Sequence, residues 1–219
     1  MVTQECGGDC FQLAPGADHP GTYLGFKEIG QCDSDQDQKD RQGGGIAACK
    51  APRLVSLLTE KGHTVRVVAT QNGLRFVSQL TLAALSGYPV TSDMWEDSGD
   101  FGMSHIRLPE WADLLIVAPA SANVIAKAAN GIADDLLTTL LCAVGTGDEA
   151  ACPVVYVPAM NTRMWHHVAT RVNIERLTSW GAQIIPPDSG RLACSDHGEG
   201  RMSEPEAILA QVEEWGLLR

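Results

Sequence analysis

The sequence predicts a single α/β domain built on a doubly wound parallel sheet with helices on both faces. Apolar runs typical of buried strands alternate with stretches of helical periodicity from about residue 43 to the C-terminus. Glycine or proline separates most of these segments. The crossovers between parallel strands should be right-handed. A chain of 219 residues that is 44% hydrophobic can bury one good-sized core, so we expect one domain.

Composition excludes several function classes. The formal net charge is −11, which argues against nucleic acid as a partner because that affinity comes largely from Lys and Arg. No apolar run reaches the roughly 20 residues that span a bilayer, and the N-terminus lacks the features of a signal peptide. We therefore expect a cytoplasmic protein that binds no membrane. The seven cysteines lack zinc-site spacing, so we predict no metal site and mostly free thiols.

Residues 1–42 differ from the rest of the chain. They are rich in Gly, Asp and Gln, and residues 31–42 are polar throughout. This composition predicts an irregular N-terminal extension. Only residues 22–26 could form a short strand.

The regular pattern begins at residues 43–45, three glycines that open a predicted helix ending before Gly62. A glycine turn at a helix N-terminus can receive a phosphate, because free N–H groups and the helix dipole favour an anion. A flexible turn explains the same glycines about as well. A strand over residues 63–70 and a helix over about 74–85 follow.

The middle of the chain holds the stretch that we expect to contact a ligand. A short helix is predicted over residues 104–112 and a buried strand over 113–118. Small residues and Asn123 then turn the chain into a helix over 121–130. Open α/β sheets bind ligands beyond the carboxyl ends of such strands, so we expect the principal cofactor here. A helix over 133–144 follows, with Asp134 and Asp135 stabilising its N-terminus.

The second half continues the alternation. It predicts a strand over residues 153–158, a helix over 162–180, a strand over 182–185 and a closing helix over 204–215. Residues 188–203 show no regular period and are predicted to form a loop. The sheet should therefore contain five or six strands.

Five groups of residues together resemble the flavin-containing cysteine decarboxylases. They are GGIAA (44–48), His105 with Ile106 before Trp111, PASAN (119–123) with NGIADDLL (130–137), PAMNTRMW (158–165), and SGRLACSD (189–196) with GEGRM (198–202). The resemblance covers about four-fifths of the chain, from residue 44 to the C-terminus. The order and spacing of these five groups argue strongly against chance agreement.

The resemblance implies a Rossmann-like flavoprotein fold that binds FMN without a covalent link. It implies an atypical extension over residues 1–42 and a decarboxylase domain over 43–219, with a substrate-recognition clamp loop over 188–203. Hydroxyl, amide and helix N-terminal N–H groups suit the phosphate and ring edges of FMN. The residues that it assigns to FMN are Gly44, Gly45, Ile46, Thr70, Asn72, Ser121, Ala122, Asn123, Val124 and Ala159.

The activity implied is decarboxylation of 4'-phosphopantothenoylcysteine to 4'-phosphopantetheine in coenzyme A biosynthesis, a carboxy-lyase reaction. FMN would oxidise the cysteine side chain to a thioaldehyde, whose C=S accepts the electrons released with CO2. His105 would act as base and Asn161 would hold the carboxylate. Cys194 would supply the proton that returns the resulting ene-thiolate to a saturated thiol. The substrate contacts implied are Asn161, Met164, Arg191, Ala193 and Met202.

Two other functions stay open. Relatives that modify the C-terminal cysteine of a peptide lack a cysteine at the position of Cys194, so this residue favours the phosphopantothenoyl substrate over a peptide. Some relatives are non-catalytic and regulate phosphatases, but His105 and Asn161 argue against that role. Ser195 replaces the usual glycine, a small residue for a small residue.

The N-terminus departs from the family. Its members open with an apolar strand, central in the sheet, that runs into a Ser- or Thr-Gly-Gly turn. Residues 37–42 stand in that place and are too polar for a buried strand, and Gly43 replaces the hydroxyl. Either residues 23–26 supply a substitute strand, or this start is an aberrant version of the family's.

The resemblance also implies an assembly and a partner enzyme. In the family the flavin lies between subunits, so we expect a homo-oligomer, a trimer or a dodecamer. The ligase domain that usually follows in bacteria is absent, so a separate ligase is expected.

Overall fold

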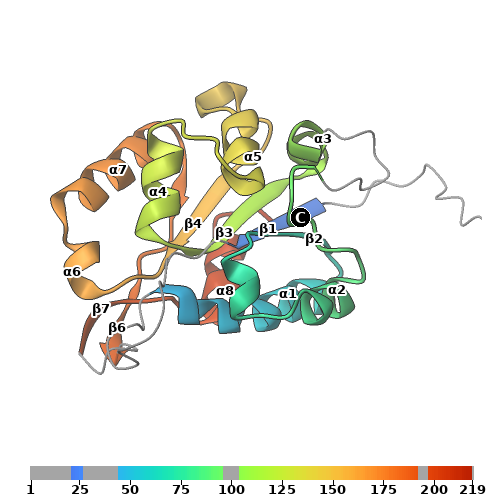
Figure 1. Cartoon of the computed structure of the whole chain (residues 1–219), viewed down its shortest axis with the longest axis horizontal. Helices are drawn as coiled ribbons and strands as arrows, with labels where there is room; N and C mark the ends of the chain where they lie inside the picture. Colours follow the sequence, from blue (N-terminus) through green and yellow to red (C-terminus); the bar gives the residue numbers. More distant parts are fainter. Residues whose placement is uncertain (1–20, 27–43, 96–103, 192–196, 219) are drawn as a thin grey trace, which may run out of the picture.

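The fold is known from a computed structural model that describes residues 21–26, 44–95, 104–191 and 197–218. Its main sheet has five strands, all parallel, in the order β2-β1-β3-β4-β5 (Figure 1). This arrangement confirms the predicted doubly wound α/β class. The strands are β1 (Gly21–Phe26), β2 (Thr64–Ala69), β3 (Leu114–Ala120), β4 (Val154–Pro158) and β5 (Gln183–Ile184).

Helices cover both faces of this sheet (Figure 1). One face packs against α1 (Ala51–Glu60), α2 (Gln79–Ser86) and α8 (Pro205–Glu214). The other packs against α3 (Ser104–Trp111), α4 (Ala122–Ala129), α5 (Leu136–Val144) and α7 (Val168–Ser179). The shorter helices are η1 (Gly44–Lys50), η2 (Gly73–Arg75), η3 (Gly147–Glu149) and α6 (Thr162–Trp165). No helix within the described residues is long and apolar enough to cross a membrane.

Strand β3 forms the middle of the core. All of its residues are buried, as expected for a strand covered by helices on both faces. It continues to Ala120, beyond the predicted end, because Ala120 pairs with Pro158 after a register shift. The peptide bond between Ala118 and Pro119 is cis.

Strand β1 fills the position that the sequence left open. It lies between β2 and β3 and pairs with both in parallel. An empty position there would leave facing edges of two strands unpaired. Residues 21–26 therefore supply the central strand, the first of the two alternatives. The division of the chain at residues 42 and 43 stays a prediction.

Three predicted elements differ in the structure. The helix over residues 74–85 is broken at Ser78, which has an extended ψ of 132°. The helix over 162–180 is also broken, because His167 is extended and its Nδ1 accepts a hydrogen bond from Ala169 N that caps α7. The predicted clamp loop contains an antiparallel hairpin of β6 (Asp188–Arg191) and β7 (His197–Arg201).

Candidate active site

The loop between β3 and α4 places one group of predicted FMN-contact residues together. Ser121 is the N-cap of α4, and its Oγ accepts a hydrogen bond from Val124 N at 3.4 Å. Ala159 N donates to Ala120 O at 3.0 Å, which holds the end of β4 beside this loop. The side chain of Val124 is fully buried, so any contact from it to a ligand comes through its backbone.

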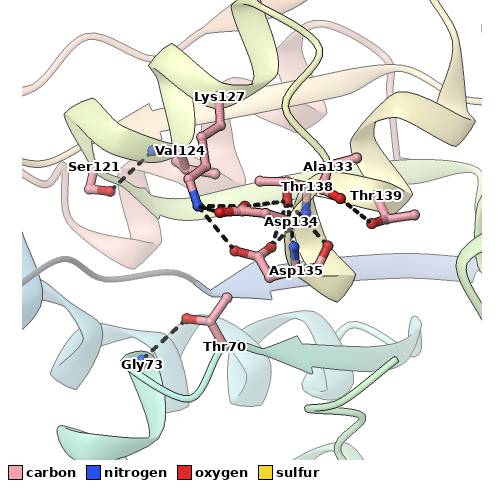
Figure 2. A network of polar contacts seen from close by, with 10 residues as sticks. All are labelled: Thr70, Gly73, Ser121, Val124, Lys127, Ala133, Asp134, Asp135, Thr138 and Thr139. Carbon is pink, nitrogen blue, oxygen red and sulfur yellow. Dashed lines mark hydrogen bonds and ion pairs between the residues drawn. The ribbon is translucent and has the colours of Figure 1, made fainter. Parts of the chain in front are cut away.

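A pocket of about 240 Å³ opens beyond the carboxyl end of β2. It is lined by Thr70 and Asn72 after β2 and by Asn123 at the start of α4. The Oγ1 of Thr70 accepts a hydrogen bond from Gly73 N at 3.3 Å, which shapes the turn (Figure 2). Three residues that the family resemblance assigned to FMN thus line one pocket, although they come from distant parts of the chain.

Two charged residues line the same pocket and were not predicted to do so. Lys127 Nζ lies 2.5 Å from Asp134 Oδ1 and 3.8 Å from Asp135 Oδ2 (Figure 2). Lys127 and Asp135 line the pocket. Lys127 lies on the turn of α4 that follows Asn123 on one helix face, and this spacing is the signal that could have identified it.

The adjacent aspartates confirm their predicted place at a helix start. Asp135 is the N-cap of α5, and its carboxylate accepts a hydrogen bond from Thr138 N at 2.9 Å. The Thr138 hydroxyl in turn accepts from Asp135 N at 3.1 Å, which completes a capping box. The Asp135 carboxylate thus caps α5, and the carboxylates of Asp134 and Asp135 both pair with Lys127.

The glycine turn begins the first helical segment after β1. Gly44, Gly45 and Ile46 open η1, which continues into α1 and packs against β3. The first N–H groups of a helix have no intrahelical partner and can bind an anion. Ile46 is not among the described residues that line the 240 Å³ pocket. Gly43, where relatives have a hydroxyl, lies outside the described residues.

His105 has a feature expected of a residue that meets a ligand. It lies on α3, which packs against α5. Its Nδ1 atom is buried and has no hydrogen-bond partner in the part of the chain that the structure describes. Buried polar atoms nearly always have a partner in a native protein, so this nitrogen is suited to a group from outside the chain.

Asn161 is held in one orientation by the backbone. It is the N-cap of α6, and its Oδ1 accepts a hydrogen bond from Arg163 N at 2.8 Å. This bond directs the amide oxygen into the helix and leaves Nδ2 as the donor end. Helices α3 and α6 lie on opposite sides of the molecule (Figure 1). The structure of one chain therefore does not bring His105 and Asn161 together.

The predicted clamp residues are only partly visible. Ala193 and Cys194 lie outside the described residues, and Arg191 is described by its backbone at the end of β6. Met164 is 41% exposed on α6 and accessible to a ligand. Met202 is 1% exposed in the core, and its carbonyl oxygen accepts a hydrogen bond from Lys50 Nζ at 2.6 Å. A substrate contact from the Met202 side chain stays a prediction that this burial does not favour.

A larger pocket, of about 460 Å³, lies at the amino ends of β4 and β5. It contains none of the predicted site residues and is lined mostly by small and apolar side chains. Cys152 lies in its wall, and burial, reinforced by the nearby Asp113 carboxylate, raises the pKa of this thiol to about 11. A thiol with this pKa is a poor nucleophile at neutral pH. Within the described residues, no three His, Cys, Asp or Glu side chains are grouped to hold a metal ion.

Comparison with known proteins places these features in a family. A family model described as Flavoprotein matches residues 42–216. The coenzyme A biosynthesis bifunctional protein CoaBC of Mycolicibacterium smegmatis is 47% identical over 171 residues, which are 77% of this chain and 39% of that protein. The chain thus spans about two-fifths of the length of the curated relatives that it matches.

Two solved structures are similar over nearly their whole length. A cysteine-to-serine variant of a PPC decarboxylase, in complex with pantothenoylaminoethenethiol, has a TM-score of 0.74 and 32% identity, covering 91% of this chain and 99% of that one. The FMN-binding protein AtHal3 has a TM-score of 0.70 and 32% identity, covering 90% of this chain and 97% of that one.

Proposed function

The chain belongs to the Flavoprotein family, and we propose that it is an FMN-dependent carboxy-lyase converting 4'-phosphopantothenoylcysteine to 4'-phosphopantetheine in coenzyme A biosynthesis. The observation that carries this proposal is the match to a PPC decarboxylase over 99% of that protein's chain. The compound bound there has an ethenethiol group, which is what a cysteine becomes when it loses CO2 and two electrons.

The residues of this chain fit FMN. The pocket beyond β2 offers the Thr70 hydroxyl and the side-chain amides of Asn72 and Asn123. The start of α4 adds a helix N-terminus, and η1 adds a second. FMN, when bound, supplies the oxidation of the substrate's cysteine side chain and the later return of hydride. The residues proposed to hold it are Gly44, Gly45, Ile46, Thr70, Asn72, Ser121, Ala122, Asn123, Val124 and Ala159.

Asn161 is proposed to bind the substrate carboxylate. Its capping bond to Arg163 N fixes the amide, so that Nδ2 is the end that donates. A neutral donor orients a carboxylate without the strong stabilisation that an arginine would give. Asn161 therefore positions the group that leaves as CO2 and keeps it reactive. Met164, Arg191, Ala193 and Met202 are the further substrate contacts proposed.

His105 and Cys194 are proposed to move protons. The Nδ1 of His105, to which no described residue is hydrogen bonded, would accept a proton from the cysteine side chain of the substrate. Cys194 would donate the proton that converts the decarboxylated ene-thiolate to a saturated thiol. Each role requires the side chain to touch the substrate, so each is open to direct test.

We further propose that the active site lies between copies of this chain, in a trimer or a dodecamer located in the cytoplasm. The support is the separation of α3, with His105, from α6, with Asn161 (Figure 1). A neighbouring copy can present its own His105 to the Asn161 of the first. Closed homo-oligomers with such repeated interfaces are common.

Mixing two inactive variants tests this arrangement. His105→Asn and Asn161→Ala chains are unfolded together, refolded as a 1:1 mixture and assayed. If each site takes His105 from one copy and Asn161 from another, about a quarter of the sites are intact and activity returns. A site formed within one chain predicts no recovery at any ratio. Refolded wild-type protein is the control.

A substrate comparison tests the reaction itself. The FMN-loaded protein is offered 4'-phosphopantothenoylcysteine and, separately, a peptide with a C-terminal cysteine, and products are followed by mass spectrometry. We expect loss of CO2 from the first compound and formation of a saturated thiol. Turnover of the peptide alone would assign the chain to the peptide-modifying relatives, and turnover of neither would favour a non-catalytic role.

A further inference from the structure

Strand β7 is hydrogen bonded to the residues on both sides of Asn161. Met160 N donates to Gly200 O at 2.9 Å, and the Thr162 hydroxyl donates to Glu199 O at 2.7 Å. The turn that carries Asn161 is therefore attached to the hairpin immediately before and immediately after this residue.

Two glycines allow the hairpin to come this close. A Cβ atom at Gly200, whose φ is +140°, would lie 2.0 Å from Met160 O. A Cβ atom at Gly198 would lie 2.4 Å from Thr162 Oγ1. Only glycine fits at Gly200, because the atom that a Cβ would meet there belongs to the backbone. At Gly198 the absence of a Cβ leaves room for the Thr162 hydroxyl. The hairpin and the Asn161 turn are thus in direct contact along three successive residues of β7.

The carboxylate of Glu199 adds a side-chain connection. Its Oε2 accepts a hydrogen bond from Trp165 Nε1 at 3.2 Å and lies 3.4 Å from His166 Nε2. Trp165 is 5% exposed and packs in the core, whereas the Glu199 side chain is 49% exposed. Helix α6 has only four residues, too few to be stable without outside contacts. Glu199 therefore joins both ends of α6 to β7.

We propose that Glu199 is a positioning residue for Asn161. Through its main-chain oxygen it holds Thr162 at the first turn of α6, and through its carboxylate it holds Trp165 and His166 at the last. Both connections keep the helix start in place, and the helix start fixes the amide of Asn161. In this proposal Glu199 acts on the substrate only through Asn161. The catalytic consequence rests on the proposed function, but the structural role does not.

The test uses two variants of Glu199 and a matched control. Glu199→Ala removes both side-chain contacts, whereas Glu199→Gln keeps an acceptor for the Trp165 indole. Glu175→Ala removes an exposed carboxylate from the neighbouring α7. The side-chain amide signal of Asn161 is followed in NMR spectra of the FMN-loaded, 15N-asparagine-labelled assembly, and is assigned by its loss in Asn161→Asp.

We expect Glu199→Ala to shift or broaden the Asn161 amide signal and to speed exchange of the Trp165 Nε1 proton about 10-fold. Glu199→Gln should restore the Asn161 signal, and Glu175→Ala should leave it unchanged. The KM for 4'-phosphopantothenoylcysteine should rise about 10-fold in Glu199→Ala, with FMN affinity within about 2-fold of wild type. Thermal melting of each variant confirms that it is folded.

An unchanged Asn161 signal in Glu199→Ala would overturn the proposal, and so would a disturbed signal in Glu175→Ala. Because the NMR measurement needs no turnover, its outcome is separate from that of the proposed function. A wild-type protein that binds FMN but decarboxylates nothing would contradict the function and leave the positioning result standing.

Discussion

The carboxyl and amino edges of the main sheet both contain a pocket, and the two pockets differ in kind. The pocket at the carboxyl edge, about 240 Å³, is lined by hydroxyl, amide and charged side chains from β2, α4 and the start of α5. The pocket at the amino edge, about 460 Å³, is lined mainly by glycine, alanine and apolar side chains. The smaller pocket is lined by three of the residues proposed to bind FMN, so we expect polar groups rather than volume to mark the ligand site.

The direction of the chain explains the difference. Helices begin at the carboxyl edge, where Ser121, Asp135 and Asn161 cap them with side-chain oxygens. Helices end at the amino edge, where the chain turns at Gly145 and Gly181 with φ of 79° and 94°. Capping chemistry thus places polar groups at one edge and residues without side chains at the other.

The largest effect is expected at Asn161. Asn161→Asp keeps an acceptor for Arg163 N, and so keeps the cap of α6, but places a negative charge against the substrate carboxylate. We expect kcat/KM to fall by about 10²–10⁴-fold with FMN still bound. Steady-state decarboxylation rates measure this. Cys142→Ser, at the amino edge, is the control, and a comparable fall in its kcat/KM would show that activity does not depend specifically on the carboxyl edge.

A smaller effect is expected on FMN affinity. Asn123→Ala removes an amide from the carboxyl-edge pocket and should weaken FMN binding about 10-fold, the usual cost of one hydrogen bond to a bound ligand. Quenching of FMN fluorescence on titration gives the dissociation constant. Gln183→Ala removes an amide from the larger pocket and should change that constant less than about 2-fold. A larger loss of FMN affinity in Gln183→Ala than in Asn123→Ala would indicate that FMN binds at the amino edge.

The capping network should contribute stability of its own. Asp135→Ala removes the cap of α5 and one partner of Lys127, so the free energy of unfolding should fall by about 1 kcal/mol. Urea denaturation of the apoprotein measures this. Asp148→Ala in η3, near the amino edge, serves as the control and should change it by less than about 0.5 kcal/mol. Equal losses would show that Asp135 acts only as a surface charge.

The thiols at the amino edge test the structure of the larger pocket rather than the function of the protein. Cys142 is exposed, whereas Cys152 is buried with a pKa raised to about 11. Alkylation at pH 8, followed by peptide mapping, should modify Cys152 about 100-fold more slowly than Cys142, because only the thiolate reacts and access is limited. Unfolding in urea should remove most of this difference. Fast modification of Cys152 in the folded protein would contradict its burial in the wall of the larger pocket.

Much of the fold could be predicted because its strands are short apolar runs separated by helical periodicity. The exceptions depend on single side chains or distant contacts. His167 interrupts a continuous helical pattern by capping α7, and hydrophobic periodicity alone does not reveal such a cap. The β6–β7 hairpin has a polar, glycine-rich sequence and is held by contacts to Met160 and Thr162, far away in the chain.

The residues of the candidate site were predicted one by one from the resemblance. The fold adds which of them lie close together, which the sequence could not show. Thr70 and Asn123 are brought to one pocket by strand order, which no local pattern encodes. Lys127 lies four residues after Asn123, which was a usable signal, but its aspartate partners lie beyond the turn at Gly131 and could not be assigned to it from the sequence. The placement of β1 was left open because six residues do not determine which strands they pair with. The roles of His105, Asn161 and Cys194 stay predictions.

The most direct test of the account is the reaction of the purified protein with and without FMN. The apoprotein is titrated with FMN and each point is assayed for CO2 and 4'-phosphopantetheine from 4'-phosphopantothenoylcysteine. We predict that both products appear in equal amounts and in proportion to the bound flavin, with the flavin oxidised again at the end. FMN binding without either product, or product formation that is independent of FMN, would contradict the account.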